Sequence, residues 1–81
     1  MTQLILYYQP DCHLCDEAEG IMHAAGLGER YLKVDIETDL ELLKRYGIYV
    51  PVLKRNDNDR ELFWPFDHAD IVALLETSPD Q

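Results

Sequence analysis

The chain carries two cysteines, Cys12 and Cys15, which stand where one sequence pattern gives way to another. Before them, segment 3–8 is rich in Leu, Ile and Tyr and contains no turn residue, which predicts a strand buried on both faces. After them, apolar residues recur at the spacing of one helix face, which predicts a helix from about residue 12. A bridge between two such close cysteines would restrain the unfolded chain little, so the fold must rest on a hydrophobic core.

The rest of the chain continues this alternation of strands and helices. We expect strands at 3–8, 31–35, 52–54 and 61–64, and helices that begin near Cys12, Thr38 and Asp67. The order β-α-β-α-β-β-α predicts an α/β fold in which the first two strands are parallel, with a right-handed crossover, and the last two form an antiparallel hairpin. The result is a four-stranded mixed sheet with helices on its faces. We expect a single domain, 1–81, with a frayed polar tail at 78–81.

The helix patterns also predict boundaries and inward faces. Thr38 and Glu41 form a candidate capping box at the start of the second helix, Gly47 is expected to end that helix, and Asp67 is expected to cap the last one. The side chains expected to face the core are Leu14, Ala18, Ile21, Met22 and Ala25 in the first helix, Leu40, Leu43 and Tyr46 in the second, and Ile71, Leu74 and Leu75 in the third.

Charge and hydropathy exclude two classes of partner. Seven Lys and Arg residues stand against sixteen Asp and Glu residues, which gives a formal net charge of −9. Nucleic acids and anionic membranes need clustered basic residues, so we expect neither as a partner. The apolar run 4–8 is far shorter than the roughly 20 residues of a membrane span. Because the chain has few cysteines and its start does not resemble a signal peptide, we expect a cytoplasmic protein.

The position of Cys12 at the start of a helix favours thiol chemistry. The N–H groups and partial positive charge of a helix N-terminus stabilise a thiolate, which lowers the pKa of the Cys12 thiol. Cys15 lies one turn further along, within reach of Cys12 but more buried. We therefore expect Cys12 to attack a disulfide and Cys15 to resolve the mixed disulfide. His13 would lower the pKa of the Cys12 thiol by adding positive charge, and Asp11 would raise it if it faces the sulfur.

Val50 and Pro51 stand immediately before the third expected strand, where a proline can adopt the cis peptide. Here the chain resembles the glutaredoxin branch of the thioredoxin superfamily. The resemblance rests on Tyr8-Gln9-Pro10-Asp11-Cys12-His13-Leu14-Cys15, Val34-Asp35-Ile36, Tyr46-Gly47-Ile48-Tyr49-Val50-Pro51-Val52-Leu53 and the helix 67–75. It implies a thioredoxin-like fold, a redox-active dithiol and a cis-proline loop against that dithiol. In that loop Val50 would offer backbone groups to a substrate, and Tyr8 and Tyr49 are further candidates for substrate contact.

Two departures from the family bear on the partner. Glutaredoxins usually have a basic residue before the dithiol and a Gly-Gly pair before the last helix, and both help to hold glutathione. This chain has Tyr7-Tyr8-Gln9 and Trp64-Pro65-Phe66 instead, and residues 1–29 contain no Lys or Arg. Acidic surroundings would repel an anionic tripeptide, so glutathione is disfavoured. We expect a protein or small-molecule disulfide as substrate, with a preference for a basic partner.

Two alternatives stay open beside disulfide exchange. Cys12 and Cys15 could supply two thiolates to a metal, but a closed zinc site needs four ligands and would be shared between chains or completed by His68. An iron–sulfur cluster bridged by a dimer belongs to the same class. The domain could instead be a non-catalytic module that holds a peptide in the proline groove. Disulfide exchange itself requires no cofactor, since the electrons reside in the two sulfurs.

Overall fold

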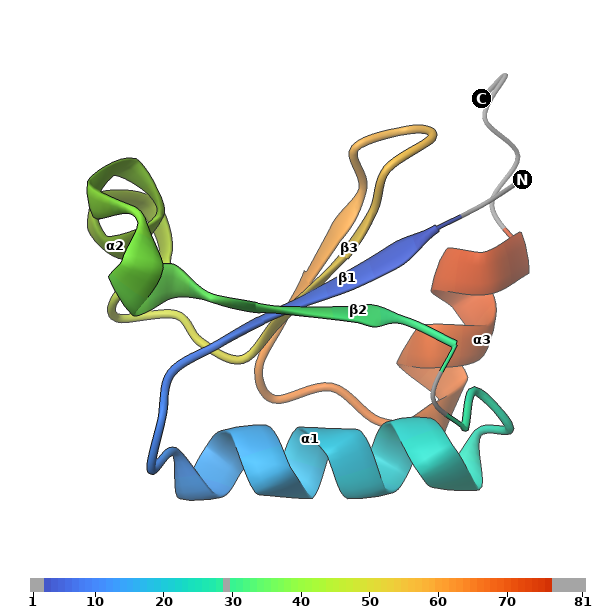
Figure 1. Cartoon of the computed structure of the whole chain (residues 1–81). Coiled ribbons are helices and arrows are strands. Elements are labelled where there is room, and N and C mark those ends of the chain that lie inside the picture. The colour runs from blue at the N-terminus through green and yellow to red at the C-terminus, as the bar shows by residue number, and fades with distance from the viewer. Residues whose placement is uncertain (1–2, 29, 77–81) are drawn as a thin grey trace.

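A computed structural model describes residues 3–28 and 30–76 (Figure 1). Its elements are β1 (Leu4–Tyr8), α1 (His13–Ala24), β2 (Leu32–Asp35), the 3-10 turn η1 (Ile36–Thr38), α2 (Leu40–Tyr46), β3 (Val52–Arg55), β4 (Glu61–Phe63) and α3 (His68–Glu76). The predicted β-α-β-α-β-β-α order is confirmed, with η1 added before α2. The tail at 78–81, which was expected to fray, lies outside the described residues.

The four strands form one mixed sheet in the order β2-β1-β3-β4. β1 runs parallel to β2 and antiparallel to β3, with Tyr7 opposite both Val34 and Val52. β3 and β4 form the antiparallel hairpin, in which Val52 lies opposite Phe63. α1 and α3 cover one face of the sheet and α2 packs on the other (Figure 1). This is the α/β arrangement that the sequence predicts.

The core consists of two clusters of buried side chains, one on each face of the sheet. The larger contains Leu4, Leu6, Ala18, Met22, Leu27, Leu53, Phe66, Ile71 and Leu74, and the smaller contains Tyr7, Ile36, Tyr46 and Val52. Alternation along β1 sends Leu4 and Leu6 to the larger cluster and Tyr7 to the smaller one. The central strand is therefore buried on both faces, as its unbroken apolar run indicates.

The expected helix faces are wrong for three leucines. Leu14, Leu40 and Leu75 are all exposed. Adjacent helix residues point about 100° apart, so Leu14 and Cys15 cannot both face the sheet, and Cys15 takes the buried place. Leu75 is likewise turned outward by its buried neighbour Leu74. Leu40 is the first residue of the short helix α2, whose last residue carries the packing against the sheet.

The predicted capping box at the start of α2 is also wrong. Thr38 belongs to η1, and its Oγ1 donates to the carbonyl oxygen of Asp35. Asp39 is the N-cap instead, and its Oδ1 accepts the backbone N–H groups of Glu41 and Leu42 at 2.9 and 3.4 Å. Aspartate ranks at least as high as threonine at an N-cap and adds a negative charge at the positive end of the helix dipole. The helix therefore begins after Asp39.

Two other predicted helix boundaries are confirmed. Asp67 Oδ1 accepts the N–H of Asp70 at 2.9 Å, and Asp70 Oδ2 accepts the N–H of Asp67 at 3.1 Å, so the two residues cap α3 reciprocally. Gly47 follows α2, where a Cβ atom would lie 2.5 Å from the carbonyl oxygen of Leu43. Only a residue without a side chain fits this close approach.

Arg55 is a buried charged residue that joins the hairpin to the end of α3. Its Nη1 donates to the carbonyl oxygen of Leu74 at 2.6 Å, and its Nε and Nη2 donate to the two carboxylate oxygens of Asp57 at 2.9 and 2.6 Å. The two-point pairing with Asp57 balances the buried charge, while the bond to Leu74 satisfies a carbonyl in the last turn of the helix.

We expect Arg55→Met to lower the free energy of unfolding by about 3 kcal/mol, because it removes the buried hydrogen bond to the carbonyl oxygen of Leu74 and the two-point pairing with Asp57. Chemical denaturation measures this change. Lys54→Met is the matched control: the ammonium of Lys54 lies 3.7 Å from the exposed Asp59, so its loss should be below about 1 kcal/mol. Equal losses in the two variants would contradict the anchoring role of Arg55.

Candidate active site

The two cysteines lie at the end of the sheet where β1 ends. β1 stops at Tyr8, the chain turns, and Cys12 becomes the N-cap of α1. Asp11 in this turn has φ of 58°, a left-handed conformation that aspartate adopts more readily than most residues. Because β1 and β3 are antiparallel, the end of β1 and the start of β3 meet at this same end of the sheet (Figure 1).

Cys12 and Cys15 are joined by a disulfide. The side chain of Cys15 faces the sheet and is 3% exposed, whereas Cys12 is only partly buried. The sulfur of Cys12 also accepts the backbone N–H of Cys15 at 3.2 Å. The pair thus joins a partly exposed cysteine at the positive end of α1 to an enclosed one.

The two residues that we expect to tune the Cys12 thiol are both exposed. The side chain of His13 is directed along α1, and its Nε2 lies 3.9 Å from Oε2 of Glu17, one turn away. Asp11 lies in the turn before Cys12. His13 therefore has a carboxylate beside it that offsets positive charge on its ring, and the effect of either residue on Cys12 stays a prediction.

The loop before β3 contains a cis peptide bond between Val50 and Pro51. Pro51 is fully buried, Val50 is partly buried and Tyr49 is half exposed. The N–H groups of Tyr49 and Val50 both donate to the carbonyl oxygen of Tyr46, at 2.8 and 3.1 Å. A substrate that pairs with the N–H of Val50 would have to compete with this internal hydrogen bond.

Tyr46 fixes the same loop through its side chain, a role that the sequence did not indicate. Its ring stacks on Tyr7 of β1, with 4.5 Å between the centroids, and its hydroxyl donates to Glu61 of β4. Burial and the hydrogen bond to the Glu61 carboxylate raise the pKa of Tyr46. The last residue of α2 is thus tied to two strands, and the loop that follows it starts from a fixed point.

Exposed apolar side chains gather at this end of the sheet. Ile48 is 89% exposed, and Tyr49 beside it contacts the exposed ring of Phe63 edge to face, with centroids 5.4 Å apart. Phe63 ends β4 opposite Val52, so it lies next to the loop. Leu14 is exposed in the first turn of α1, between the cysteines. Of these four, only Tyr49 was a candidate for substrate contact from the sequence. Phe63 reaches the loop through the strand register, which the sequence does not give.

Tyr8, a predicted substrate contact, lies against the edge strand β2. The ammonium of Lys33 is 4.6 Å from the centroid of the Tyr8 ring and 3.2 Å from Oε2 of Glu19. The hydroxyl of Tyr31 donates to Oε1 of the same carboxylate at 2.6 Å. Burial raises the pKa of Glu19, but the hydrogen bonds from Tyr31 and Lys33 outweigh it, so the pKa lies below its usual value. This cluster ties α1 to β2.

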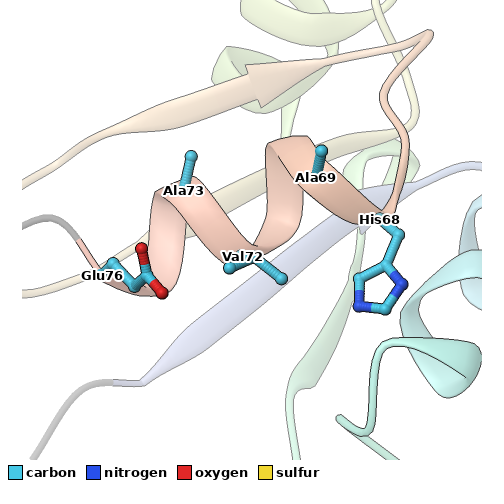
Figure 2. A pocket seen from close by; sticks show the side chains of 5 residues that line it. All are labelled: His68, Ala69, Val72, Ala73 and Glu76. Carbon is cyan, nitrogen blue, oxygen red and sulfur yellow. The ribbon is translucent and has the colours of Figure 1, made fainter.

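A hollow of about 500 Å³ on α3 lies apart from the dithiol, since α3 packs at the opposite end of α1 from the cysteines (Figure 1). It is lined by His68, Ala69, Val72, Ala73 and Glu76. Figure 2 shows these side chains spread around the outer surface of the helix, where small apolar groups separate the imidazole from the carboxylate. The hollow therefore does not collect polar groups around a common point.

Two features are absent from residues 3–28 and 30–76. Within these ranges, three or more His, Cys, Asp or Glu side chains do not gather into a group that could hold a metal ion. In the same ranges we find no helix with the length and apolar character needed to cross a membrane.

Comparisons with known proteins agree with this fold. Residues 3–76 match the model of the glutaredoxin-like domain (DUF836). Protein XcR50 from X. campestris is 42% identical, covers 94% of this chain and 99% of its own, and superposes with a TM-score of 0.83. Protein Ne2328 from Nitrosomonas europaea is 27% identical over 89% of this chain and 88% of its own, with a TM-score of 0.75.

A more distant structure shares the fold alone. The Trx4 domain of ERdj5 is 20% identical over 93% of this chain and 76% of its own, with a TM-score of 0.60. The search of curated proteins found no match. The fold is thus thioredoxin-like.

We expect Tyr31→Phe to destabilise the protein by about 1 kcal/mol at neutral pH, because it removes a hydrogen bond to the Glu19 carboxylate. A carboxyl whose pKa is lowered in the folded state adds stability above its unfolded pKa and loses it as pH falls through the folded value. The difference between the variant and the native chain should therefore shrink as the pH falls through the lowered pKa of Glu19.

Denaturation at several pH values measures this difference. Tyr8→Phe, which keeps the ring beneath Lys33, is the control and should change stability by less than about 0.5 kcal/mol at every pH. A Tyr31→Phe effect that does not vary with pH would show that the hydroxyl does not act through Glu19.

Proposed function

The chain belongs to the glutaredoxin-like domain family, and on that premise we propose that it is a thiol–disulfide oxidoreductase. The observation that carries the proposal is the unequal burial of two bonded cysteines: Cys15 is enclosed, whereas Cys12 is partly exposed at a helix N-terminus. Cys12 is the nucleophile and Cys15 the resolving thiol. A structural bridge would not need one of its sulfurs at the surface.

The exchange takes two steps. The thiolate of reduced Cys12 attacks one sulfur of the substrate disulfide, forms a mixed disulfide and releases the other substrate sulfur as a thiolate. Cys15 then loses its proton and attacks the sulfur of Cys12, which releases the second substrate thiolate and forms the internal disulfide. The substrate gains two electrons and the dithiol loses two, so the exchange needs no cofactor. The reverse sequence oxidises a substrate dithiol.

The fold supports the first step by stabilising negative charge on Cys12. The N–H of Cys15 donates to its sulfur, and the dipole of α1 places partial positive charge there. The same interactions favour Cys12 as the leaving group in the reverse sequence, when a substrate thiolate attacks the substrate's sulfur in the mixed disulfide, since a better stabilised thiolate leaves faster. Asp11 and His13 adjust this balance from their exposed positions beside the sulfur.

The loop that ends at Pro51 positions the substrate in this proposal. It lies at the same end of the sheet as the dithiol, because Val52 pairs with Tyr7. Pro51 is buried, so it acts by shaping the backbone, while Val50 and Tyr49 supply the groups that a substrate meets. Tyr8 flanks the dithiol turn from β1. A dithiol that works as a reductant suits the cytosol, which we propose as the compartment.

Cys12→Ser should abolish the reduction of hydroxyethyl disulfide, a small neutral substrate. Cys15→Ser should still complete the first step and accumulate a mixed disulfide on Cys12, which mass spectrometry detects. Serine is a good N-cap, so Cys12→Ser should fold with a thermal unfolding midpoint close to that of the native chain.

Three outcomes would contradict the proposal. An adduct on Cys15 in the Cys12→Ser variant would reverse the roles of the two cysteines. A native dithiol that fails to reduce the neutral disulfide would exclude the oxidoreductase activity. Retention of a bound partner peptide by Cys12→Ser, without turnover in the native chain, would identify a binding module instead.

A further inference from the structure

We infer that the dithiol face selects a polypeptide disulfide whose cysteine is flanked by an apolar side chain and by Lys or Arg, in preference to glutathione disulfide. This inference rests on the proposed disulfide exchange and names its substrate class. It is carried by two surfaces that meet at Cys12, an apolar rim and an acidic border.

The apolar rim consists of Leu14, Ile48, Tyr49 and Phe63, all exposed. These residues come from three segments that the chain order separates: the first turn of α1, the loop after α2 and the end of β4. They come to one end of the sheet because β1 and β4 end there and β3 begins there. Apolar side chains gathered beside a reactive group are typical of a docking surface, so the rim favours a partner with an apolar side chain.

The acidic border consists of Asp11, Asp16 and Glu17, all exposed within five residues of Cys12. The titratable group beside them on the same helix is His13, whose ring already lies next to Glu17. The described stretch from residue 3 to residue 28 contains no Lys or Arg. The dithiol turn and the start of α1 therefore carry a net negative field.

The basic residues of the neighbouring elements do not cancel this field. Lys33 of β2 is bound to Glu19, and Arg30 donates to carbonyl oxygens beyond the far end of α1. Lys44 and Arg45 precede the proline loop in sequence, but they belong to α2, which packs on the opposite face of the sheet from α1 (Figure 1). A cationic substrate segment is thus attracted on the side of Cys12.

The charge of the border acts on the approach of the substrate. Glutathione disulfide is an anion, and exposed carboxylates beside the nucleophile slow its encounter, whereas a Lys- or Arg-bearing peptide is steered toward the sulfur. The rim adds apolar contact that the hydrophilic glutathione chain cannot use. The two surfaces therefore discriminate in the same direction.

The experiment compares peptide disulfides of equal length that differ at one flanking position. Two of the peptides carry a Leu near the cysteine and differ in having Lys or Glu beside it. A third peptide has Ser in place of that Leu. Stopped-flow mixing with the reduced protein gives each second-order rate. Each rate is divided by the rate of the same disulfide with dithiothreitol, which removes differences in intrinsic reactivity.

The Lys peptide should react about tenfold faster than the Glu peptide at low ionic strength. The ratio should fall toward one between about 0.01 M and about 1 M salt, as the screening length drops from ~30 Å to ~3 Å. The Leu peptide should react several-fold faster than its Ser counterpart at both salt concentrations, since apolar contact is not screened. Glutathione disulfide, which has neither the added cation nor the apolar side chain, should react more slowly than the Glu peptide.

Variants assign the two preferences to the two surfaces. Asp16→Asn with Glu17→Gln should reduce the Lys-to-Glu ratio, and Glu76→Gln on α3 should leave it unchanged (Figure 2). Phe63→Ser should reduce the Leu-to-Ser ratio. Its matched control is Leu32→Ser, because Leu32 lies on the other edge strand, opposite Ile5 at the far end of the sheet, and is 50% exposed compared with 47% for Phe63.

The outcomes separate this inference from the activity on which it rests. If neutral hydroxyethyl disulfide fails to oxidise the dithiol, the proposed oxidoreductase function is wrong. If it reacts, but the Lys and Glu peptides have equal normalised rates or glutathione disulfide matches the Lys peptide, the exchange stands and the inferred selectivity is overturned. Preferences that persist unchanged in the Asp16→Asn/Glu17→Gln and Phe63→Ser variants overturn it as well.

Discussion

The pairing of β1 with β3 is the interaction on which the site depends. Tyr7 lies opposite Val52, so the strand that leads to Cys12 ends beside the strand that begins after Pro51. A slip of one residue would exchange the two faces of β1 and send Tyr7 into the cluster occupied by Leu6. The different cores on the two faces hold this register, and the register in turn holds the dithiol and the proline loop at one end of the sheet.

Core and site also share residues. Cys15 fills a buried place in the first turn of α1, which is the enclosed position that the proposed resolving thiol requires, and Leu14 points outward. Tyr46 packs in the smaller cluster, while its carbonyl oxygen holds the N–H groups of Tyr49 and Val50. Neither residue can be assigned to stability or to function alone. Changes that loosen the packing of α1 or α2 therefore act on the geometry of the dithiol end as well.

The sequence was sufficient for what local patterns and chain order determine. The order of strands and helices along the chain, the mixed sheet and the Asp67 cap follow from periodicity, crossover rules and capping chemistry. The rotation of a helix about its axis depends instead on which neighbour packs better, and so Cys15 rather than Leu14 faces the sheet. The contact between Tyr49 and Phe63 needs the register of the hairpin and the path of the loop, and neither can be derived from the spacing of those residues.

The carboxylates at the start of α1 affect two charges, the thiolate of Cys12 and the charge of an approaching substrate. These two charges differ in their exposure to solvent. Asp16 in the first turn stabilises α1 through the helix dipole, but its negative charge disfavours a thiolate on Cys12. The N–H of Cys15 counters this effect through a direct contact that salt does not screen, whereas the exposed carboxylates act through water. In the proposed exchange, the internal contact acts on the charge state of the sulfur, and the carboxylates act on the molecules that approach it. The proposed exchange is therefore compatible with an acidic helix start, because the two effects act on the sulfur and on its approaching partner separately.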